Sequence, residues 1–135
     1  MPAGPEALGL AYFVAVKFAG YSAAANYLRR QYPESKVNPL LAGGVRTVIG
    51  IVVGISAVFA TEQFGIVRST VAFFAFLFPT RILEWLLLLW LFFERPNGSW
   101  QRAIGWSVKG TGWSYLLDIP AILAVFVLPG GVWVC

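Results

Sequence analysis

Five charged side chains lie within long apolar stretches of this 135-residue chain, and their types and positions suit the binding of an ion. These residues are Lys17, Arg46, Arg81, Glu84 and Asp118. A charged side chain at the centre of a membrane helix costs about 2.5–3.5 kcal/mol on the insertion scale, so it normally faces the protein interior and has a function. Three cations and two carboxylates leave one surplus positive charge, and arginine stays protonated in proteins. The set predicts a net positive intramembrane site that binds an anionic ligand or lipid headgroup.

The spacing of these residues indicates which way some of them point. Arg81 and Glu84 are three positions apart and share one face of a helix. Arg46 is followed at steps of four by Gly50 and Gly54, a GxxxG pattern that allows two helices to approach closely. We therefore expect Gly50 and Gly54 to serve helix packing and the five charges to line one shared site. The alternative is a set of local ion pairs that only set helix register.

The composition predicts the class of protein that holds these charges. Hydrophobic residues make up 59% of the chain and charged residues 12%, whereas soluble domains carry about 25% charged residues. The mean hydropathy is +0.73. We predict an all-α integral membrane protein in which residues 1–135 form a single domain, a compact bundle of four transmembrane helices.

The helices that position the charges are predicted from apolar runs and their end signals. We place them at about 5–28, 39–61, 66–93 and 111–128, each long enough to cross a hydrocarbon core of roughly 30 Å. Asn38 and Pro39 are an N-cap followed by a proline in the first helical position. Pro96-Asn97-Gly98 is a turn signal that ends the third helix.

Lysine and arginine in the connecting segments predict the orientation in the membrane. The first and third connections contain six of them, whereas the second contains Arg68 alone. Basic residues in short loops favour the cytoplasmic side. We expect an inner or plasma membrane protein with both termini on the non-cytoplasmic side. The six residues are Arg29, Arg30, Lys36, Arg95, Arg102 and Lys109.

The third connection contains two tryptophans and two basic residues that suit the headgroup layer of the bilayer. Trp100, Arg102, Trp106 and Lys109 are expected to contact lipid headgroups, preferably anionic ones. The segment 99–109 is interpreted either as a short interfacial helix or as an ordinary loop anchored by tryptophan.

Several chemistries are excluded by the residue types. The sequence has no histidine and one cysteine, Cys135, so imidazole catalysis, histidine-ligated metals and internal disulfides are ruled out. We expect no cofactor and no metal. The basic residues follow membrane topology, so nucleic acid is not expected as a partner. The expected partners are anionic membrane lipids and either further copies of this chain or a larger membrane complex.

Three functions fit these observations. The first is a small membrane protein that binds or transports an anionic ligand or lipid headgroup at the charged site. The second is an accessory or structural subunit of a larger membrane complex, which predicts that some of the charges pair with a neighbouring protein. The third is a small intramembrane lipid-modifying enzyme with Glu84 or Asp118 as general acid or base. Without a recognised catalytic signature, a non-enzymatic role is expected.

Overall fold

The computed structural model describes residues 5–64, 70–93, 98–124 and 126–127, and its regular structure there is entirely helical. Four helices follow one another along the chain: α1 (Pro5–Gln31), α2 (Pro39–Phe64), α3 (Thr70–Phe92) and α4 (Trp100–Ala124). The all-helical class predicted from the sequence is confirmed. Arg68, Arg95 and Cys135, which entered the orientation argument, lie outside the described residues.

The beginning of α2 follows the predicted capping chemistry. The Asn38 side-chain oxygen accepts a hydrogen bond from the backbone N–H of Leu40 at 2.9 Å. Pro39 occupies the first helical position, where its missing N–H leaves no intrahelical hydrogen bond unmade. Helix α1 continues three residues past its predicted end, and Arg29 and Arg30 lie in its last turn, where positive charge is favourable.

The segment 99–109 differs from both interpretations that the sequence allowed. It is neither a separate interfacial helix nor a loop, because α4 begins at Trp100 and continues without a break to Ala124. Gly105 does not interrupt it, and a Cβ at this position would meet no atom within 4 Å. At 25 residues, α4 is about 37 Å long.

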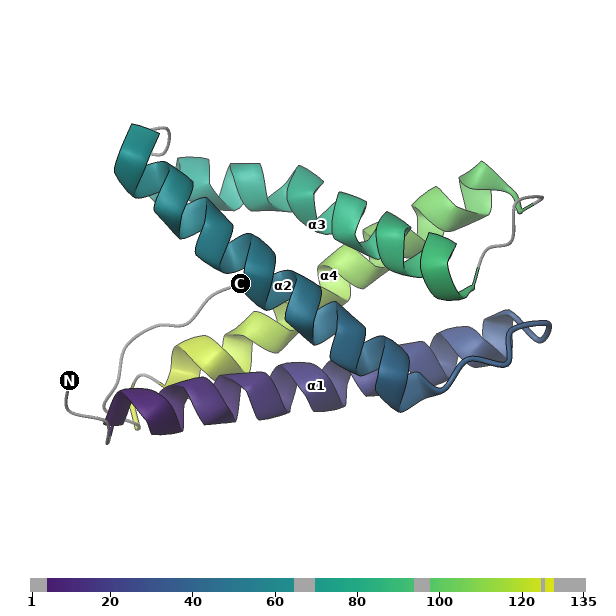
Figure 1. Ribbon diagram of the computed structural model, residues 1–135, viewed down its shortest axis with the longest axis horizontal. Coiled ribbons are helices and arrows are strands. Elements are labelled where there is room, and N and C mark those ends of the chain that lie inside the picture. Colours follow the sequence, from purple (N-terminus) through teal and green to yellow (C-terminus); the bar gives the residue numbers. More distant parts are fainter. Residues whose placement is uncertain (1–4, 65–69, 94–97, 125, 128–135) are drawn as a thin grey trace.

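The helices form two hairpins that pack against each other (Figure 1). Among the described residues, α1 packs against α2, α2 against α3, α3 against α4, and α4 against α1. Helices α1 and α2 lie closest near the ends joined by residues 32–38 and diverge toward their other ends (Figure 1). The end of α3 and the beginning of α4 lie on the same side of the molecule as residues 32–38 (Figure 1).

The two hairpins are tied together at this shared end. The Ser35 hydroxyl donates to the Phe92 carbonyl at 3.1 Å. The Arg102 guanidinium donates to the Gln31 carbonyl and lies 4.0 Å from the centre of the Tyr32 ring. The Tyr32 ring also contacts the Phe93 ring, with centroids 5.7 Å apart. These contacts position the start of α4 against the end of α1.

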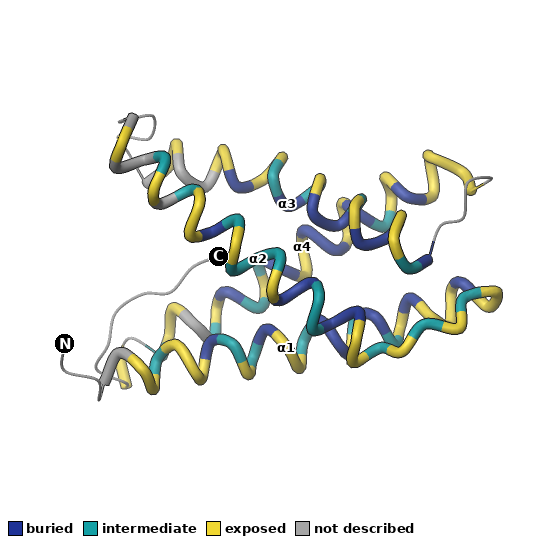
Figure 2. The backbone as a smooth tube through the Cα atoms, in the orientation of Figure 1, coloured by how far each residue is buried: buried dark blue, intermediate teal, exposed yellow. Residues whose placement is uncertain are grey.

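The burial pattern is that of a protein with apolar surroundings. Exposed residues lie along the outer faces of the helices (Figure 2). They include large apolar side chains such as Val52 and Phe59 in α2 and Leu83 and Trp90 in α3. Five charged side chains lie in the interior instead: Lys17, Arg46, Arg81, Glu84 and Asp118. Three helical stretches within the described residues are long and apolar enough to cross a membrane: Ala7–Gln31, Pro39–Ala57 and Ala75–Phe92. These stretches are consistent with the predicted membrane location.

Candidate functional site

All five charged residues singled out in the sequence are buried, and every helix contributes at least one of them. Lys17 comes from α1, Arg46 from α2, Arg81 and Glu84 from α3, and Asp118 from α4. Glu84 is 8% exposed and the other four are 1–2% exposed. We call these five residues the charge cluster.

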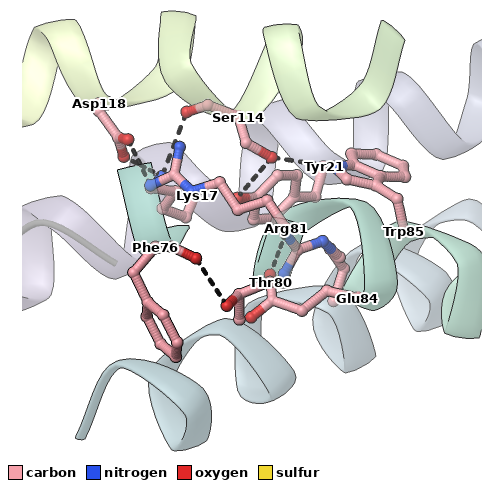
Figure 3. Close-up of polar contacts among 10 residues, drawn as sticks. Lys17, Tyr21, Phe76, Thr80, Arg81, Glu84, Trp85, Ser114 and Asp118 are labelled. Atoms are coloured by element: carbon pink, nitrogen blue, oxygen red, sulfur yellow. Dashed lines mark hydrogen bonds and ion pairs between the residues drawn. The ribbon is translucent and has the colours of Figure 1, made fainter. Parts of the chain in front are cut away.

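Asp118 is the anionic centre of one half of the cluster. Its carboxylate forms an ion pair with the Lys17 ammonium through Oδ1 and with the Arg81 guanidinium through Oδ2, the latter at 2.5 Å (Figure 3). The Lys17 ammonium also donates to the Ser114 carbonyl at 3.4 Å. One carboxylate therefore joins α4 to both α1 and α3. Its single negative charge balances only one of the two positive charges.

The other half of the cluster joins α2 to α3. Arg46 Nη2 lies 2.6 Å from Glu84 Oε2. Glu84 is one helical turn from Arg81, so the two halves of the cluster are adjacent along α3. The structure thus pairs Arg81 and Glu84 with residues of other helices, in contrast to the local pair that spacing alone allowed.

Aromatic rings surround the cations of the cluster. The Arg46 guanidinium carbon lies 4.7 Å from the centre of the Tyr21 ring and 5.4 Å from that of Trp85. The Arg81 guanidinium carbon lies 4.3 Å from the Tyr115 ring centre. The negative face of an aromatic ring attracts a desolvated cation, by about 2 kcal/mol in favourable cases. These rings partly compensate cations that have too few carboxylates.

Ser114 is a polar connection that the sequence analysis did not assign to the site. Its hydroxyl oxygen accepts from Trp85 Nε1 at 2.9 Å and from the Tyr21 hydroxyl at 3.3 Å (Figure 3). The signal for it was present, because Ser107, Thr111, Ser114 and Asp118 recur at helical spacing and all four are buried. These polar residues lower the mean hydropathy of α4, although their side chains are buried in the protein interior.

Several guanidinium nitrogens of the cluster have no hydrogen-bond partner among the residues that the structure describes. They are Nε and Nη1 of Arg46 and Nη1 of Arg81. Arg81 Nη2 is close to Asp118, but the pair lacks the alignment of a hydrogen bond. Buried donors without acceptors are costly, more so when they are charged. A further negatively charged acceptor would therefore satisfy N–H groups of the cluster that the described residues leave unmatched.

The predicted packing glycines lie beside the cluster. Gly54 is buried, and a Cβ at Gly50 would lie 3.3 Å from Arg46 Nη1, so this glycine leaves space for the guanidinium one turn away. Among the described glycines, Gly43 approaches the backbone of another helix most closely, since a Cβ there would lie 2.6 Å from the backbone nitrogen of Ser22. The packing role of Gly50 and Gly54 stays a prediction.

The residues expected at lipid headgroups lie on the first half of α4. Trp100 is 72% exposed, Lys109 is exposed, and Trp106 is half-buried against α1. The exposed Arg102 is engaged with Gln31 and Tyr32 as described above. Headgroup contact by these side chains stays a prediction.

Comparisons of the chain with protein-family models, curated proteins and solved structures found no match, so the chemistry of the cluster has to be inferred from its own geometry.

Proposed function

We propose that this chain is a four-helix transmembrane protein whose charge cluster binds an anionic ligand. The observation that carries the proposal is the combination of surplus positive charge and unmatched donors. Three buried cations share two carboxylates, and guanidinium N–H groups of Arg46 and Arg81 have no acceptor among the described residues. An anion supplies both the missing charge and the missing acceptors.

The chemistry of the donors favours an oxyanion. The planar guanidinium presents paired N–H groups that match the oxygens of a carboxylate or phosphate. Arg46 of α2 pairs with Glu84 of α3, which lies one helical turn from Arg81, so a phosphate or carboxylate at this turn could engage both guanidinium groups. A free anion and a lipid headgroup both provide such a group. Its movement across the bilayer would require an oligomer, since four helices form only a thin wall.

The ion pairing is less favourable to an accessory subunit. That function predicts charges left for a neighbouring protein, whereas each member of the charge cluster already pairs with another member. An enzyme whose metal is held by the protein alone, as catalytic zinc is, brings together three or more ligating side chains. The described residues contain no such group.

The anion site is tested by removing one cation while keeping the remaining charges balanced. Arg81→Met leaves Lys17 paired with Asp118 and Arg46 paired with Glu84. We expect the protein to remain folded and to bind phosphate or acetate about ten- to a hundredfold more weakly, the loss expected for charged hydrogen bonds. Trp85 lies 5.4 Å from the Arg46 guanidinium carbon, so a saturable change in tryptophan fluorescence in detergent would report the binding.

Lys36→Met provides the control, because Lys36 is exposed in the connection between α1 and α2. It removes the same charge from the whole protein without touching the charge cluster. Equal anion affinity in wild type, Arg81→Met and Lys36→Met would exclude an anion site at the cluster.

The proposed orientation has its own test. In a Cys135→Ser background, a membrane-impermeant thiol reagent added to intact cells is expected to label Gln63→Cys but not Lys36→Cys. Both positions are exposed. Lys36 lies just before the beginning of α2 and Gln63 near its end, so the two positions lie at opposite ends of this helix. Lys36→Cys should react once the membrane is permeabilised, and labelling of Lys36→Cys alone in intact cells would reverse the topology.

A further inference from the structure

An open groove between α1 and α4 lies beside the charge cluster and has a different character. Its volume is about 430 Å³, within the range of roughly 300–1,000 Å³ typical of ligand pockets. Small residues create it, because Ala23 and Ala24 of α1 face Gly110 of α4. Lys109 is the charged residue among those that line it.

Aromatic contacts between α1 and α4 close the two ends of this groove. At one end, the Tyr27 and Trp106 rings meet edge to face with centroids 5.8 Å apart. At the other, Trp113 Nε1 donates to the Gly20 carbonyl at 3.0 Å. The helices are therefore held at a fixed separation along the groove, and the space between them is built into the fold.

Trp85 forms the floor of the groove and separates it from the cluster. Its ring packs directly on Gly110, where a Cβ would lie 2.4 Å from Cδ2 of the indole. The indole N–H is used by Ser114, and the ring is almost completely buried beneath the groove, whose exposed lining includes Ala23, Tyr27 and Trp113. This floor suits a hydrocarbon chain and offers nothing to a hydrated ion.

Lys109 supplies the polar end of the groove. Its ammonium lies 4.3 Å from the centre of the Trp106 ring, so the side chain extends back toward the end of α4 that begins at Trp100. A lysine whose apolar stem lines a groove can extend its ammonium toward the headgroup layer, where it suits an anionic headgroup.

From these features we propose that the groove between α1 and α4 binds one anionic phospholipid. An acyl chain lies over Trp85 between Ala23 and Gly110, and the phosphate pairs with Lys109. This site is separate from the anion site proposed at the charge cluster. Lys109 favours lipids with a negatively charged headgroup, and the apolar lining favours an acyl chain.

Native mass spectrometry of the full chain in mild detergent tests this site with added phosphatidylglycerol or phosphatidylcholine. Wild type is expected to retain one phosphatidylglycerol in preference to phosphatidylcholine. Ala23→Phe fills the groove from an exposed position and should abolish retention, whereas Ala15→Phe, also exposed on α1 but outside the groove, should not. Lys109→Gln should reduce the preference for phosphatidylglycerol about fivefold, the contribution of one basic residue near anionic lipid.

The outcomes separate this groove from the charge cluster. Retention by Arg81→Met together with loss in Ala23→Phe supports the groove, with circular dichroism establishing that each variant is helical. Retention by Ala23→Phe at the level of Ala15→Phe would overturn the proposal, as would equal retention of the two lipids by wild type. Loss in Arg81→Met with retention in Ala23→Phe would assign the lipid to the charge cluster instead.

Discussion

Asp118→Asn is expected to lower the free energy of unfolding by about 3–5 kcal/mol, the cost of removing one partner from a buried ion pair. Asp118 pairs with both Lys17 and Arg81, and all three side chains are buried. Its neutralisation leaves two cations without an anion in a protein interior. Chemical denaturation in mixed micelles, followed by circular dichroism, measures the change.

Lys17→Met is the matched control for this prediction, because it removes the cationic partner of the Lys17–Asp118 ion pair and leaves the carboxylate in place. Without Lys17, Arg81 still pairs with Asp118 and Arg46 with Glu84, so the remaining buried charges are balanced. Because no buried charge is then left without a partner, Lys17→Met is expected to lower the free energy of unfolding clearly less than Asp118→Asn does. Comparable losses in Lys17→Met and Asp118→Asn would contradict the view that the cluster carries a surplus of positive charge.

Gly43→Leu is expected to destabilise the packing of α1 against α2 by about 3 kcal/mol, the upper part of the range for overpacking. A Cβ at this position would lie 2.6 Å from the backbone nitrogen and 2.8 Å from Cα of Ser22. Backbone atoms cannot rotate away as a side chain can, so one helix must shift. The same denaturation measurement applies.

The adjacent residue Gly44 controls for the intrinsic effect of replacing glycine in a helix. Its Cβ would have Phe18 Cε2 as its nearest neighbour, at an ordinary contact distance of 3.6 Å. Gly44→Leu gains the same helix propensity, about 1 kcal/mol, without the clash. If Gly43→Leu and Gly44→Leu prove equally stable, the close approach at Ser22 does not limit the packing of these helices.

The Trp85 side chain lies between the charge cluster and the groove formed by α1 and α4. Its indole lies beside Arg46 on one side and packs on Gly110 on the other. The Tyr21 ring contacts the Trp85 ring edge to face, with centroids 5.8 Å apart. Tyr21 and Trp85 both donate hydrogen bonds to the Ser114 hydroxyl oxygen. Occupancy of either site would therefore alter the environment of one tryptophan, which makes its fluorescence a common reporter for both.

Much of the charge cluster could be anticipated from single residues and their spacing. A charged side chain in an apolar helix has to be turned away from lipid, so the burial of Lys17 and Asp118 follows from cost alone. The burial of Arg46 agrees with its place four residues before Gly50 and eight before Gly54, on the GxxxG face of the helix. The continuous α4 could not be anticipated, because its polar positions face inward only once the other helices are in place.

The sequence by itself determined the helical class, the beginnings of α1 and α2 and the set of buried charges, since hydropathy, capping and the cost of burying charge act over one or two turns. Only the tertiary structure decided the partners. Asp118 joins α1 and α3, and Glu84 takes Arg46 of α2, because the rotation and depth of each helix depend on packing against the others. The close approach of Gly43 to Ser22 likewise depends on how α2 packs against α1. The groove beside Gly110 depends on how α4 packs against α1, and neither arrangement is encoded within a single helix.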